Sequence, residues 1–239
     1  MSQSLSNTDV VILCGGKGER LREIIGNMPK PMALINKTPF LRILIDYIAS
    51  FGCKRFILCV GYEKEAIKKY FQDNVLPIEV IFSEETHSLG TGGAVKNAYK
   101  YIKNSPFLVI NGDSLFKIDY NNFMLFHEEK KGDCSIALFE SHEEKKDYGG
   151  VVMDSASRIS SFNEKKNSLN KQTFFNGGIY LFQKELFTAM PDNDVFSLEY
   201  DFFPRLTSKN FFGYSAKEKF IDIGTPSRYQ QAQKLLERG

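Results

Sequence analysis

Short apolar segments alternate with amphipathic segments along the first half of the chain. Four runs of mostly apolar residues are typical of buried parallel strands; they lie at residues 10–14, 56–60, 78–82 and 107–110. Three stretches between or after them repeat apolar residues every three or four positions, as on one face of a helix. These faces consist of Leu41, Leu44, Ile45 and Ile48; of Ala66, Ile67, Tyr70 and Phe71; and of Ala94, Ala98, Tyr101 and Ile102. Repeated strand–helix units predict an α/β fold with a mainly parallel central sheet and helices on both faces.

The second half of the chain has a different pattern. Its apolar segments are short and β-like, with glycine or asparagine turns between them; they lie at residues 134–139, 150–153, 159–162 and 178–182. Helices are predicted near residues 199–208 and 227–237, around a last strand at 220–223. The charged runs at 128–131 and 143–146 are interpreted as solvated loops or helix faces. We interpret this half as an antiparallel portion added to the same sheet, so that residues 1–239 form a single domain.

Composition narrows the choice of compartment and partner. A chain of 239 residues, 42% of them hydrophobic, can bury most of its apolar surface without disulfides or metals. The net charge of +2 gives no reason to expect a nucleic-acid or membrane partner. The four cysteines are irregularly spaced, and Cys14 and Cys59 lie within apolar runs, so buried, reduced thiols are expected. No charged-then-apolar leader opens the chain, and no run approaches the roughly 20 apolar residues that span a bilayer. A cytoplasmic protein is therefore expected, and monomer and homo-oligomer both remain open.

The most informative segment follows the first predicted strand. Residues 13–21 read LCGGKGERL, and residues 29–31 read PKP. Glycines after a strand let the backbone approach a phosphate, and their N–H groups favour an anion, although any tight turn favours glycine as well. Two basic residues make the prediction of a phosphate-binding site more specific. Arg20 offers a planar charged fork to a polyphosphate, and the prolines on both sides of Lys30 restrict the backbone that aims its ammonium group.

Two other phosphate-binding motifs fit this segment poorly. The spacing G-G-x-G-x-R differs from the G-x-G-x-x-G of dinucleotide-binding folds, and no acidic residue ends a second strand about 20 residues later. The phosphate loop of NTPases requires G-K-[ST] after the glycines, which is missing here. Dinucleotide-dependent oxidoreductases and P-loop NTPases are therefore disfavoured.

Residues 13–21 together with residues 29–31 resemble the signature of the sugar nucleotidyltransferases, the nucleoside-diphosphate-sugar pyrophosphorylases, and the resemblance continues to the C-terminus. It implies a Rossmann-like three-layer α/β/α sandwich, with a nucleotide-binding half at residues 9–115 and a sugar-phosphate-binding half at residues 116–239. It also implies Mg²⁺ as cofactor, with a nucleoside triphosphate and a sugar 1-phosphate as substrates. Within the family, the chain most resembles guanylyltransferases of D-glycero-α-D-manno-heptose 1-phosphate, and next those of mannose 1-phosphate. The resemblance assigns nucleotide binding in the first loop to Leu13, Gly15, Gly16, Lys17, Gly18 and Arg20.

A second glycine-rich loop, residues 89–94, begins the third predicted helix. Permissive glycines at a helix N-terminus are the general explanation; in the resembling family the loop holds the nucleobase, which implies contacts from Gly90 and Thr91. The position that contacts the base edge falls on Glu85, and Ser88 replaces the usual proline. A carboxylate can accept from both N1–H and the 2-amino group of guanine, so Glu85 favours GTP. An exposed loop acid beside Glu84 is the alternative.

Two acids end predicted strands. Asp113 follows Gly112 at the end of the fourth strand, where open α/β sheets bind ligands, and Asp222 has apolar residues on both sides. A carboxylate in such surroundings is costly to bury unless it is paired or bound to a metal. An Asx turn at Asp113 and a helix N-cap near Asp222 are the alternatives. Together, in positions that match the metal-binding pair of the resembling family, the two acids predict a Mg²⁺ site.

Three short motifs match the sugar-phosphate contacts of the resembling family. They contain Gly149 and Gly150, Glu164 and Lys165, and Asn176 and Gly177. The resemblance implies that Glu164 binds sugar hydroxyls, that Lys165 and Lys30 bind the sugar phosphate, and that Gly112 belongs to the same subsite. Without the resemblance each motif is simply a β-turn. The segment 197–199, which reads SLE, is similar to the heptose and mannose branch, and no metal role is predicted for the three histidines.

These features predict an enzyme that joins a nucleotide to a sugar 1-phosphate and releases pyrophosphate. The sugar phosphate is already an anion, so in-line attack on the α-phosphorus needs no base, and positioning and charge neutralisation suffice. The predicted catalytic residues are Arg20, Lys30, Asp113 and Asp222. A mannose-1-phosphate guanylyltransferase, a UTP-dependent enzyme for an amino sugar and a silent sugar-nucleotide sensor remain open. The presence of all four residues argues against the sensor, and the resemblance implies a product for surface polysaccharides or glycoproteins.

Overall fold

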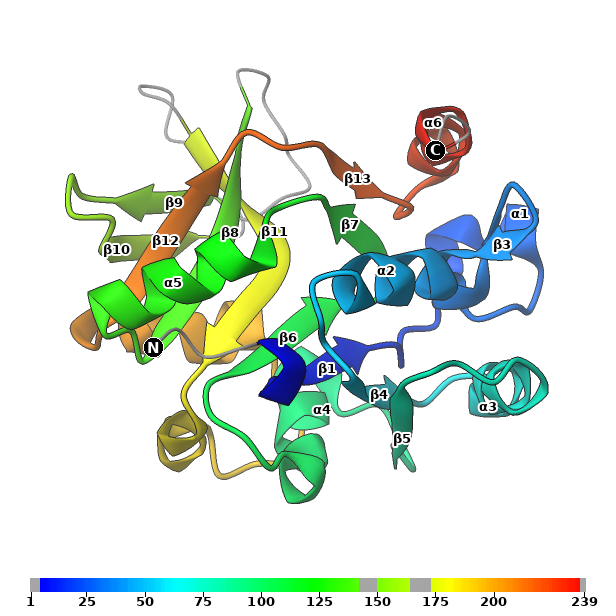
Figure 1. Cartoon of the computed structure of the whole chain (residues 1–239), viewed down its shortest axis with the longest axis horizontal. Coiled ribbons are helices and arrows are strands. Elements are labelled where there is room, and N and C mark those ends of the chain that lie inside the picture. The colour runs from blue at the N-terminus through cyan, green and yellow to red at the C-terminus, as the bar shows by residue number, and fades with distance from the viewer. Residues whose placement is uncertain (1–4, 142–149, 164–172, 237–239) are drawn as a thin grey trace.

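The computed structural model describes residues 5–141, 150–163 and 173–236. Within them, nine strands form one sheet in the order β10-β9-β11-β6-β1-β4-β5, to which β8 and β12 are joined through β11 (Figure 1). These strands are β1 (Asp9–Leu13), β4 (Arg55–Val60), β5 (Glu79–Glu84), β6 (Phe107–Asn111), β8 (Cys134–Ser141), β9 (Gly150–Met153), β10 (Ile159–Asn163), β11 (Thr173–Phe182) and β12 (Phe211–Ala216). The helices are α1 (Arg22–Ile25), α2 (Phe40–Ala49), α3 (Lys64–Asp73), α4 (Gly90–Ala98), α5 (Tyr120–Lys130) and α6 (Pro226–Leu235). The predicted α/β fold, with a mostly parallel centre and added antiparallel strands, is confirmed.

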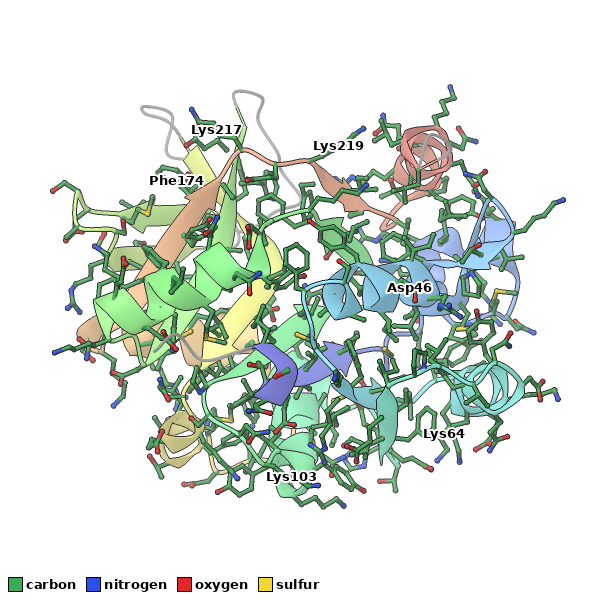
Figure 2. The ribbon with its side chains drawn as sticks, in the orientation of Figure 1. Asp46, Lys64, Lys103, Phe174, Lys217 and Lys219 are labelled. Atoms are coloured by element: carbon green, nitrogen blue, oxygen red, sulfur yellow. The ribbon has the colours of Figure 1, made fainter. Side chains whose placement is uncertain are left out.

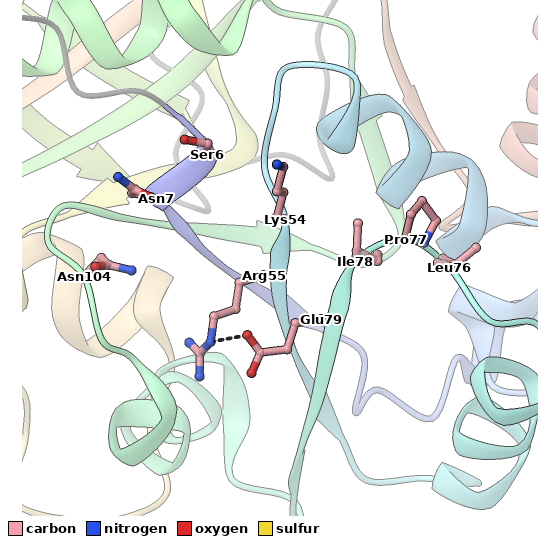
Figure 3. Close-up of a pocket in the computed structure, with 9 residues that line it drawn as sticks. All are labelled: Ser6, Asn7, Lys54, Arg55, Leu76, Pro77, Ile78, Glu79 and Asn104. Atoms are coloured by element: carbon pink, nitrogen blue, oxygen red, sulfur yellow. Dashed lines mark ion pairs between the residues drawn. The ribbon is translucent and has the colours of Figure 1, made fainter.

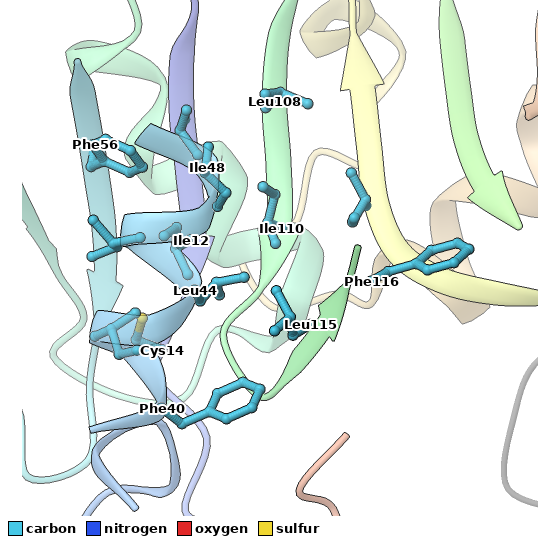
Figure 4. Packing of buried hydrophobic residues seen from close by; sticks show 14 of the residues in the cluster. Ile12, Cys14, Phe40, Leu44, Ile48, Phe56, Leu108, Ile110, Leu115 and Phe116 are labelled. Carbon is cyan, nitrogen blue, oxygen red and sulfur yellow. The ribbon is translucent and has the colours of Figure 1, made fainter. Parts of the chain in front are cut away.

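The centre of the sheet is parallel. β1 lies between β6 and β4, and β5 pairs with the other edge of β4. Alternate residues of β1 face opposite layers, because Val10 and Ile12 pack in the core that contains α2, whereas Val11 packs in the core that contains α4. Figure 4 shows Leu44 of α2 near Ile12 of β1, and Phe56 of β4 belongs to the same core. All these residues are fully buried, which explains why the central strands are continuous apolar runs.

β11 joins the parallel strands to the second half of the chain. Its C-terminal end, residues 179–182, pairs antiparallel with β6, and residues 174–175 pair with β9. The other edge of β11 pairs with β8 near both ends of the strand. The second half is not wholly antiparallel, however, because β12 lies parallel to β8. β12 was not predicted, since the glycine at its centre weakens the β-pattern. Outside the main sheet, β7 (Ser114–Phe116) pairs with β13 (Phe220–Asp222), and β2 (Leu34–Ile35) pairs with β3 (Thr38–Pro39).

The helices of the second half differ in part from the prediction. α5 was missed, although Tyr120, Phe123, Met124 and His127 are buried at helical spacing, because two of the four carry polar groups. Asp119 caps α5 by accepting from the N–H groups of the second and third residues that follow it. The helix expected near 199–208 is instead a π-helical turn at Leu198–Phe202 and a 3₁₀ turn at Phe203–Ser208. The second of these turns contains a proline, which cannot donate the hydrogen bond that a continuous helix needs. The last predicted helix is confirmed as α6.

The surface and the core separate as expected for such a domain. Asp46, Lys103 and Lys217, which Figure 2 labels, are exposed. All four cysteines are free and buried, as predicted, and burial raises the pKa of Cys53 to about 12. Within the described ranges, no helix has the length and apolar character needed to cross a bilayer.

His127 of α5 is fully buried, and its position predicts a pH dependence of stability. Its Nδ1 lies 2.8 Å from Ser135 Oγ and its Nε2 lies 3.2 Å from Gln183 Nε2. Burial lowers the pKa of His127 from 6.5 to about 4, against a smaller opposing effect of Asp133. Between these pH values the unfolded chain binds a proton that the native protein excludes. The free energy of unfolding should therefore be undiminished by this group above pH 6.5 and should fall as the pH decreases towards 4.

Urea denaturation of the wild-type protein and of His127→Gln at several pH values measures this effect. Between pH 6.5 and pH 4, the free energy of unfolding of the wild-type protein should decrease by on the order of 3 kcal/mol more than that of the variant. Because carboxylates titrate at similar pH values in both proteins, the difference between the two curves isolates His127. Parallel curves would show that the native protein accommodates the charged imidazole.

Candidate functional site

A cavity of about 250 Å³ opens at the carboxyl ends of the central parallel strands. Seven of the ten residues predicted to bind the nucleotide line it, namely Leu13, Gly15, Gly16, Glu85, Gly90, Thr91 and Asp113. The remaining lining residues are Ser88, Ala94 and Asn111. Lys17, Gly18 and Arg20 belong to the same first loop but are not among the lining residues, and the Arg20 side chain is exposed in a 3₁₀ turn at Glu19–Leu21. The structure thus brings the two glycine-rich loops and the end of β6 to one cavity.

The first glycine-rich loop leaves β1 and folds back over Lys30. Gly18 has a left-handed backbone conformation with φ of 62°, and a β-carbon there would lie 2.9 Å from Lys30 Cβ. At Gly15 a β-carbon would lie 2.9 Å from Glu85 Oε1, so this loop also contacts the predicted base reader. Gly16 is different, because no atom lies within 4 Å of the place where its β-carbon would be. Gly16 lines the cavity, so its open side is available for a ligand.

Replacement of Gly16 by alanine should therefore weaken nucleotide binding without affecting the fold. The methyl group would enter open space, and the stability should change by no more than about 0.5 kcal/mol. If phosphates approach this backbone, the methyl group should raise the KM for the nucleotide by roughly tenfold. Thermal unfolding and initial rates over a range of nucleotide concentrations measure the two effects. An unchanged KM would show that the loop does not contact the nucleotide at Gly16.

Glu85 and Glu84 are adjacent in sequence but lie in different environments. Glu84 is exposed and forms ion pairs with Lys64 at 2.8 Å and Lys68 at 2.9 Å; Figure 2 marks Lys64, which begins α3. These lysines lower the pKa of Glu84 to about 2. Glu85 is half-buried in the cavity, and its Oε2 accepts from Leu89 N at 3.3 Å. Burial raises the pKa of Glu85, against the opposing effect of the Leu89 N–H. Of the two acids, only Glu85 faces the cavity.

Asp113, Asp222 and Lys30 come together although they are far apart in the sequence. Asp113 follows β6, and the pairing of β7 with β13 places Asp222 opposite Ser114. Lys30 Nζ lies 2.5 Å from Asp113 Oδ2. A β-carbon at Gly224 would lie 2.8 Å from Asp222 Oδ1 and 3.6 Å from Lys30 Nζ, so the lysine lies near both acids. The Asp222 carboxylate also accepts from Gly224 N at 2.7 Å. Three of the four residues predicted to be catalytic therefore form one cluster.

The chemistry of this cluster fits a divalent ion held partly by the protein. In the part of the chain that the structure describes, no three His, Cys, Asp or Glu side chains form a metal-binding group. Asp113 and Asp222 would therefore supply two carboxylates, and water and phosphate oxygens would supply the other ligands, which is the usual coordination of Mg²⁺. The Asp113 side chain is 40% exposed and lines the cavity, whereas the Asp222 side chain is 12% exposed. Asp113 is thus accessible to a nucleotide that carries the ion.

The second glycine-rich loop has a structural role that the sequence did not reveal. Two N–H groups in the first turn of α4, from Gly92 and Gly93, donate to the carbonyl oxygen of Phe196 at 3.0 and 3.2 Å. A β-carbon at Gly93 would lie 2.0 Å from Asp194 O, and one at Gly92 would lie 2.2 Å from the Phe196 ring. These two glycines are therefore required for the segment 194–199 to pack on the start of α4. Gly90 and Thr91, not Gly92 and Gly93, line the cavity.

The residues predicted for the sugar phosphate are only partly described by the structure. Gly149, Glu164 and Lys165 lie outside the described residues, and Gly150 begins β9. Asn176 and Gly177 lie where the register of β11 against β8 shifts. The next residue, Gly178, brings this irregularity close to the cavity, since a β-carbon there would lie 2.9 Å from Asn111 Nδ2. Gly112 donates its N–H to Leu13 O at 3.0 Å, where β6 and β1 end together.

Two residues with a place in the site were not predicted. Asn111 lines the cavity, and its buried Oδ1 has no hydrogen-bond partner among the described residues. Its only signal in the sequence was its place before Gly112 and Asp113 at the end of a strand. Glu199 accepts a hydrogen bond of 2.6 Å from Thr91 Oγ1. Its segment had been singled out by similarity alone, because no local pattern connects residue 199 with residue 91.

A larger cavity, of about 640 Å³, lies at the opposite end of the parallel strands. None of the predicted site residues lines it. Its principal charged group is Arg55, which lies 2.7 Å from the buried Asp9 and 2.9 Å from Glu79; Figure 3 shows Arg55 and Glu79 facing each other. Arg55 also donates to Tyr101 O at 2.8 Å. Arg55 and Glu79 thus form ion pairs within the fold, and the smaller cavity, which the predicted site residues line, is the better candidate for chemistry.

Comparisons with known proteins identify the family of the chain. A model of the family described as nucleotidyl transferase matches residues 9–239. The D-glycero-α-D-manno-heptose 1-phosphate guanylyltransferase of Aneurinibacillus thermoaerophilus is 36% identical over 230 residues, which cover 96% of this chain and 98% of the relative. The enzyme of the same name from Campylobacter jejuni is 41% identical over 224 residues, or 92% and 96% of the two chains. The crystal structure of HddC from Yersinia pseudotuberculosis has a TM-score of 0.85 and 37% identity, and the match covers 96% of this chain and 100% of that chain. HddC has also been crystallised with GMP-PN, and that structure has a TM-score of 0.83.

Proposed function

Because this chain belongs to the nucleotidyl transferase family, we propose that it transfers GMP from GTP to D-glycero-α-D-manno-heptose 1-phosphate. The products are GDP-heptose and pyrophosphate. The observation that carries the proposal is the single cavity in which Gly16, Glu85, Thr91 and Asp113 meet at the carboxyl ends of the parallel strands. Two nearly full-length relatives named for this reaction support the choice of substrates, and so does the complex of HddC with GMP-PN.

The cluster of Lys30, Asp113 and Asp222 suits in-line transfer at the α-phosphorus. The oxygen of the sugar phosphate forms the new bond to phosphorus as the bond to pyrophosphate breaks, and no proton has to be removed. Asp113 and Asp222 would hold Mg²⁺, which supplies charge neutralisation at the phosphate oxygens. Lys30 would offset charge where the two phosphates approach each other, and Arg20 would bind the β- and γ-phosphates from its exposed position on the first loop.

Glu85 would set the preference for guanine. Its carboxylate faces the cavity, half-buried, beside the first glycine-rich loop. Guanine presents two adjacent donors, N1–H and the 2-amino group, which two carboxylate oxygens can accept together. Uracil and thymine present one N–H between two carbonyl oxygens, and these oxygens would be repelled by a carboxylate.

Replacement of Glu85 by glutamine is expected to lower kcat/KM for GTP by about 10- to 100-fold, since one acceptor becomes a donor that faces a donor of guanine. The kcat/KM for other nucleotides should fall less. Glu84→Gln is the matched control, because the adjacent carboxylate pairs with lysines in solvent and not with the cavity. Equal effects of the two substitutions on GTP would contradict a base-reading role for Glu85.

Pyrophosphate release with Mg²⁺ across a grid of substrates tests the proposal as a whole. One axis holds GTP, UTP, CTP, ATP and dTTP; the other holds the 1-phosphates of the heptose, mannose, glucose and N-acetylamino sugars. Turnover confined to GTP with the heptose is the expected result. Turnover with mannose 1-phosphate or with UTP would keep the reaction class and change the substrate pair. Nucleotide binding without any turnover would indicate a sensor.

A further inference from the structure

Two series of hydrogen bonds, which we call the cavity arm and the β11 arm, meet at Glu199. One arm begins in the nucleotide cavity, where Thr91 donates its hydroxyl to Glu199 Oε2 at 2.6 Å. The other arm begins at the irregularity in β11, where Asn176 Nδ2 donates to Tyr180 OH at 2.9 Å. Tyr180 OH in turn donates to Glu199 Oε1, at 3.5 Å. The half-buried carboxylate thus connects the cavity to the strand that carries a predicted contact of the sugar phosphate.

The direction of the bonds in the β11 arm is fixed by a group that can only donate. Gly178 N donates to Asn176 Oδ1 at 2.9 Å, so the amide nitrogen of Asn176 faces Tyr180. The oxygen of Tyr180 then accepts from Asn176, and its hydrogen is directed to Glu199. Each step therefore places an acceptor opposite a donor, and the last acceptor is Glu199.

In the cavity arm, too, each group donates to the next one in the direction of Glu199. Leu198 N donates to Thr91 Oγ1 at 2.9 Å, so the hydroxyl hydrogen of Thr91 is directed to Glu199. Ser197 accepts from Glu199 N at 3.1 Å and donates its own hydroxyl to Glu199 Oε2 at 2.8 Å. Three hydroxyl donors thus converge on one side chain. A carboxylate satisfies all of them because it accepts on both oxygens and donates on neither.

We propose that Glu199 is a positioning residue for the transfer reaction. Its carboxylate holds Thr91 in the nucleotide cavity and, through Tyr180, orients the amide of Asn176 towards the sugar 1-phosphate. This inference rests on the proposed function, which gives Asn176 its substrate. Within the described residues the arm uses one N–H of Asn176, and the second N–H of the amide is available to a substrate oxygen.

Glu199→Gln and Tyr180→Phe test the proposal. In Glu199→Gln the amide oxygen can still accept from Thr91 and Ser197, but the new NH₂ group faces Tyr180. The Tyr180 oxygen then faces two donors, Asn176 Nδ2 and the new amide, and its hydrogen loses its acceptor in the β11 arm. In Tyr180→Phe the same arm loses its middle member. Each variant should raise the KM for the sugar 1-phosphate by about tenfold and change the KM for GTP by less than about twofold. The double variant should be no worse than either single variant, because both act on one arm.

Glu185→Gln is the matched control, since Glu185 is an exposed acid on the 3₁₀ turn at Lys184–Ala189, which follows β11. It should leave both KM values unchanged. Equal increases of both KM values in Glu199→Gln would indicate general damage and overturn the proposal. Additive effects in the double variant, or an unchanged KM for the sugar 1-phosphate, would overturn it as well.

A measurement without turnover separates this inference from the proposed function. The side-chain amide signal of Asn176 in a ¹⁵N NMR spectrum can be identified by its loss in Asn176→Asp. The signal should shift in Glu199→Gln and in Tyr180→Phe and stay in place in Glu185→Gln. Unchanged signals in the first two variants would refute the arm whatever the substrates are. Failure of the wild-type protein to use any substrate pair, with the shifts present, would count against the proposed function alone.

Discussion

Replacement of Asp113 by asparagine is expected to lower the rate of pyrophosphate release by about 10²- to 10³-fold. The substitution removes the carboxylate that lines the cavity and lies 2.5 Å from Lys30 Nζ. It should hardly affect folding, because the side chain is 40% exposed and an ion pair at such a site contributes about 0–1 kcal/mol. Turnover and thermal unfolding, measured on the same preparations, check both parts. Wild-type turnover in the variant would exclude Asp113 from the chemistry.

The expected loss of turnover in Asp113→Asn has two explanations, because Asp113 can bind a metal ion or can position Lys30. Lys30→Met separates them, because it breaks the ion pair and keeps the carboxylate. The affinity for Mn²⁺, as a spectroscopic substitute for Mg²⁺, should be measured in the presence of a GTP analogue that is not turned over. If the metal assignment is correct, Asp113→Asn should weaken Mn²⁺ binding strongly, and Lys30→Met should not. Unchanged Mn²⁺ affinity in Asp113→Asn would show that the carboxylate acts by positioning Lys30.

Replacement of Gly93 by alanine should produce the largest loss of stability. The new β-carbon would lie 2.0 Å from Asp194 O and 3.0 Å from Leu89 Cβ, so the segment 194–199 must move away from α4. Overpacking of this kind costs about 1–3 kcal/mol, which corresponds to a decrease in Tm of roughly 2–12 °C for a chain of this length. Because Thr91 is held by Leu198 and Glu199, nucleotide binding should weaken together with stability.

Gly16→Ala is the control for this experiment. Both residues are glycines in segments that contribute to the cavity, Gly16 in the loop after β1 and Gly93 in the first turn of α4, and both gain one methyl group. The methyl group at Gly16 meets open space, whereas the one at Gly93 meets a backbone carbonyl. The expected results are therefore opposite: a lower Tm in Gly93→Ala, and a changed nucleotide KM at constant Tm in Gly16→Ala. A wild-type Tm in Gly93→Ala would contradict the packing described for residues 194–199.

The parts of the fold that the sequence predicted are those whose signal is local. The run at residues 10–14 is apolar because both faces of β1 are buried, and Leu41 to Ile48 repeat at helical spacing because one side of α2 packs on the sheet. α5 shows how such a signal is lost. His127 belongs to the buried face, but an isolated histidine does not look apolar in a sequence.

The site was predictable where a motif is contiguous and not where the parts meet only in the fold. Glycines next to a strand end indicate a phosphate loop, and Gly15 and Gly16 do line the cavity. The approach of Asp222 to Lys30 depends on the pairing of β13 with β7, which no local pattern encodes. The role of Gly93 was hidden for the same reason, because its partner lies about a hundred residues away. Pairings of this kind follow from tertiary packing, and a single sequence contains no direct record of them.

The antiparallel pairing of β11 with β6 determines how the chain can be divided. β6 belongs to residues 9–115, but one of its edges is covered by residues 179–182. A fragment that ended near residue 116 would leave that edge of the sheet without a partner, beside residues that are fully buried in the intact chain. Such an open edge invites pairing between molecules and aggregation. Residues 9–115 and 116–239, the predicted nucleotide-binding and sugar-phosphate-binding halves, are therefore not expected to fold as units that could be expressed or exchanged separately.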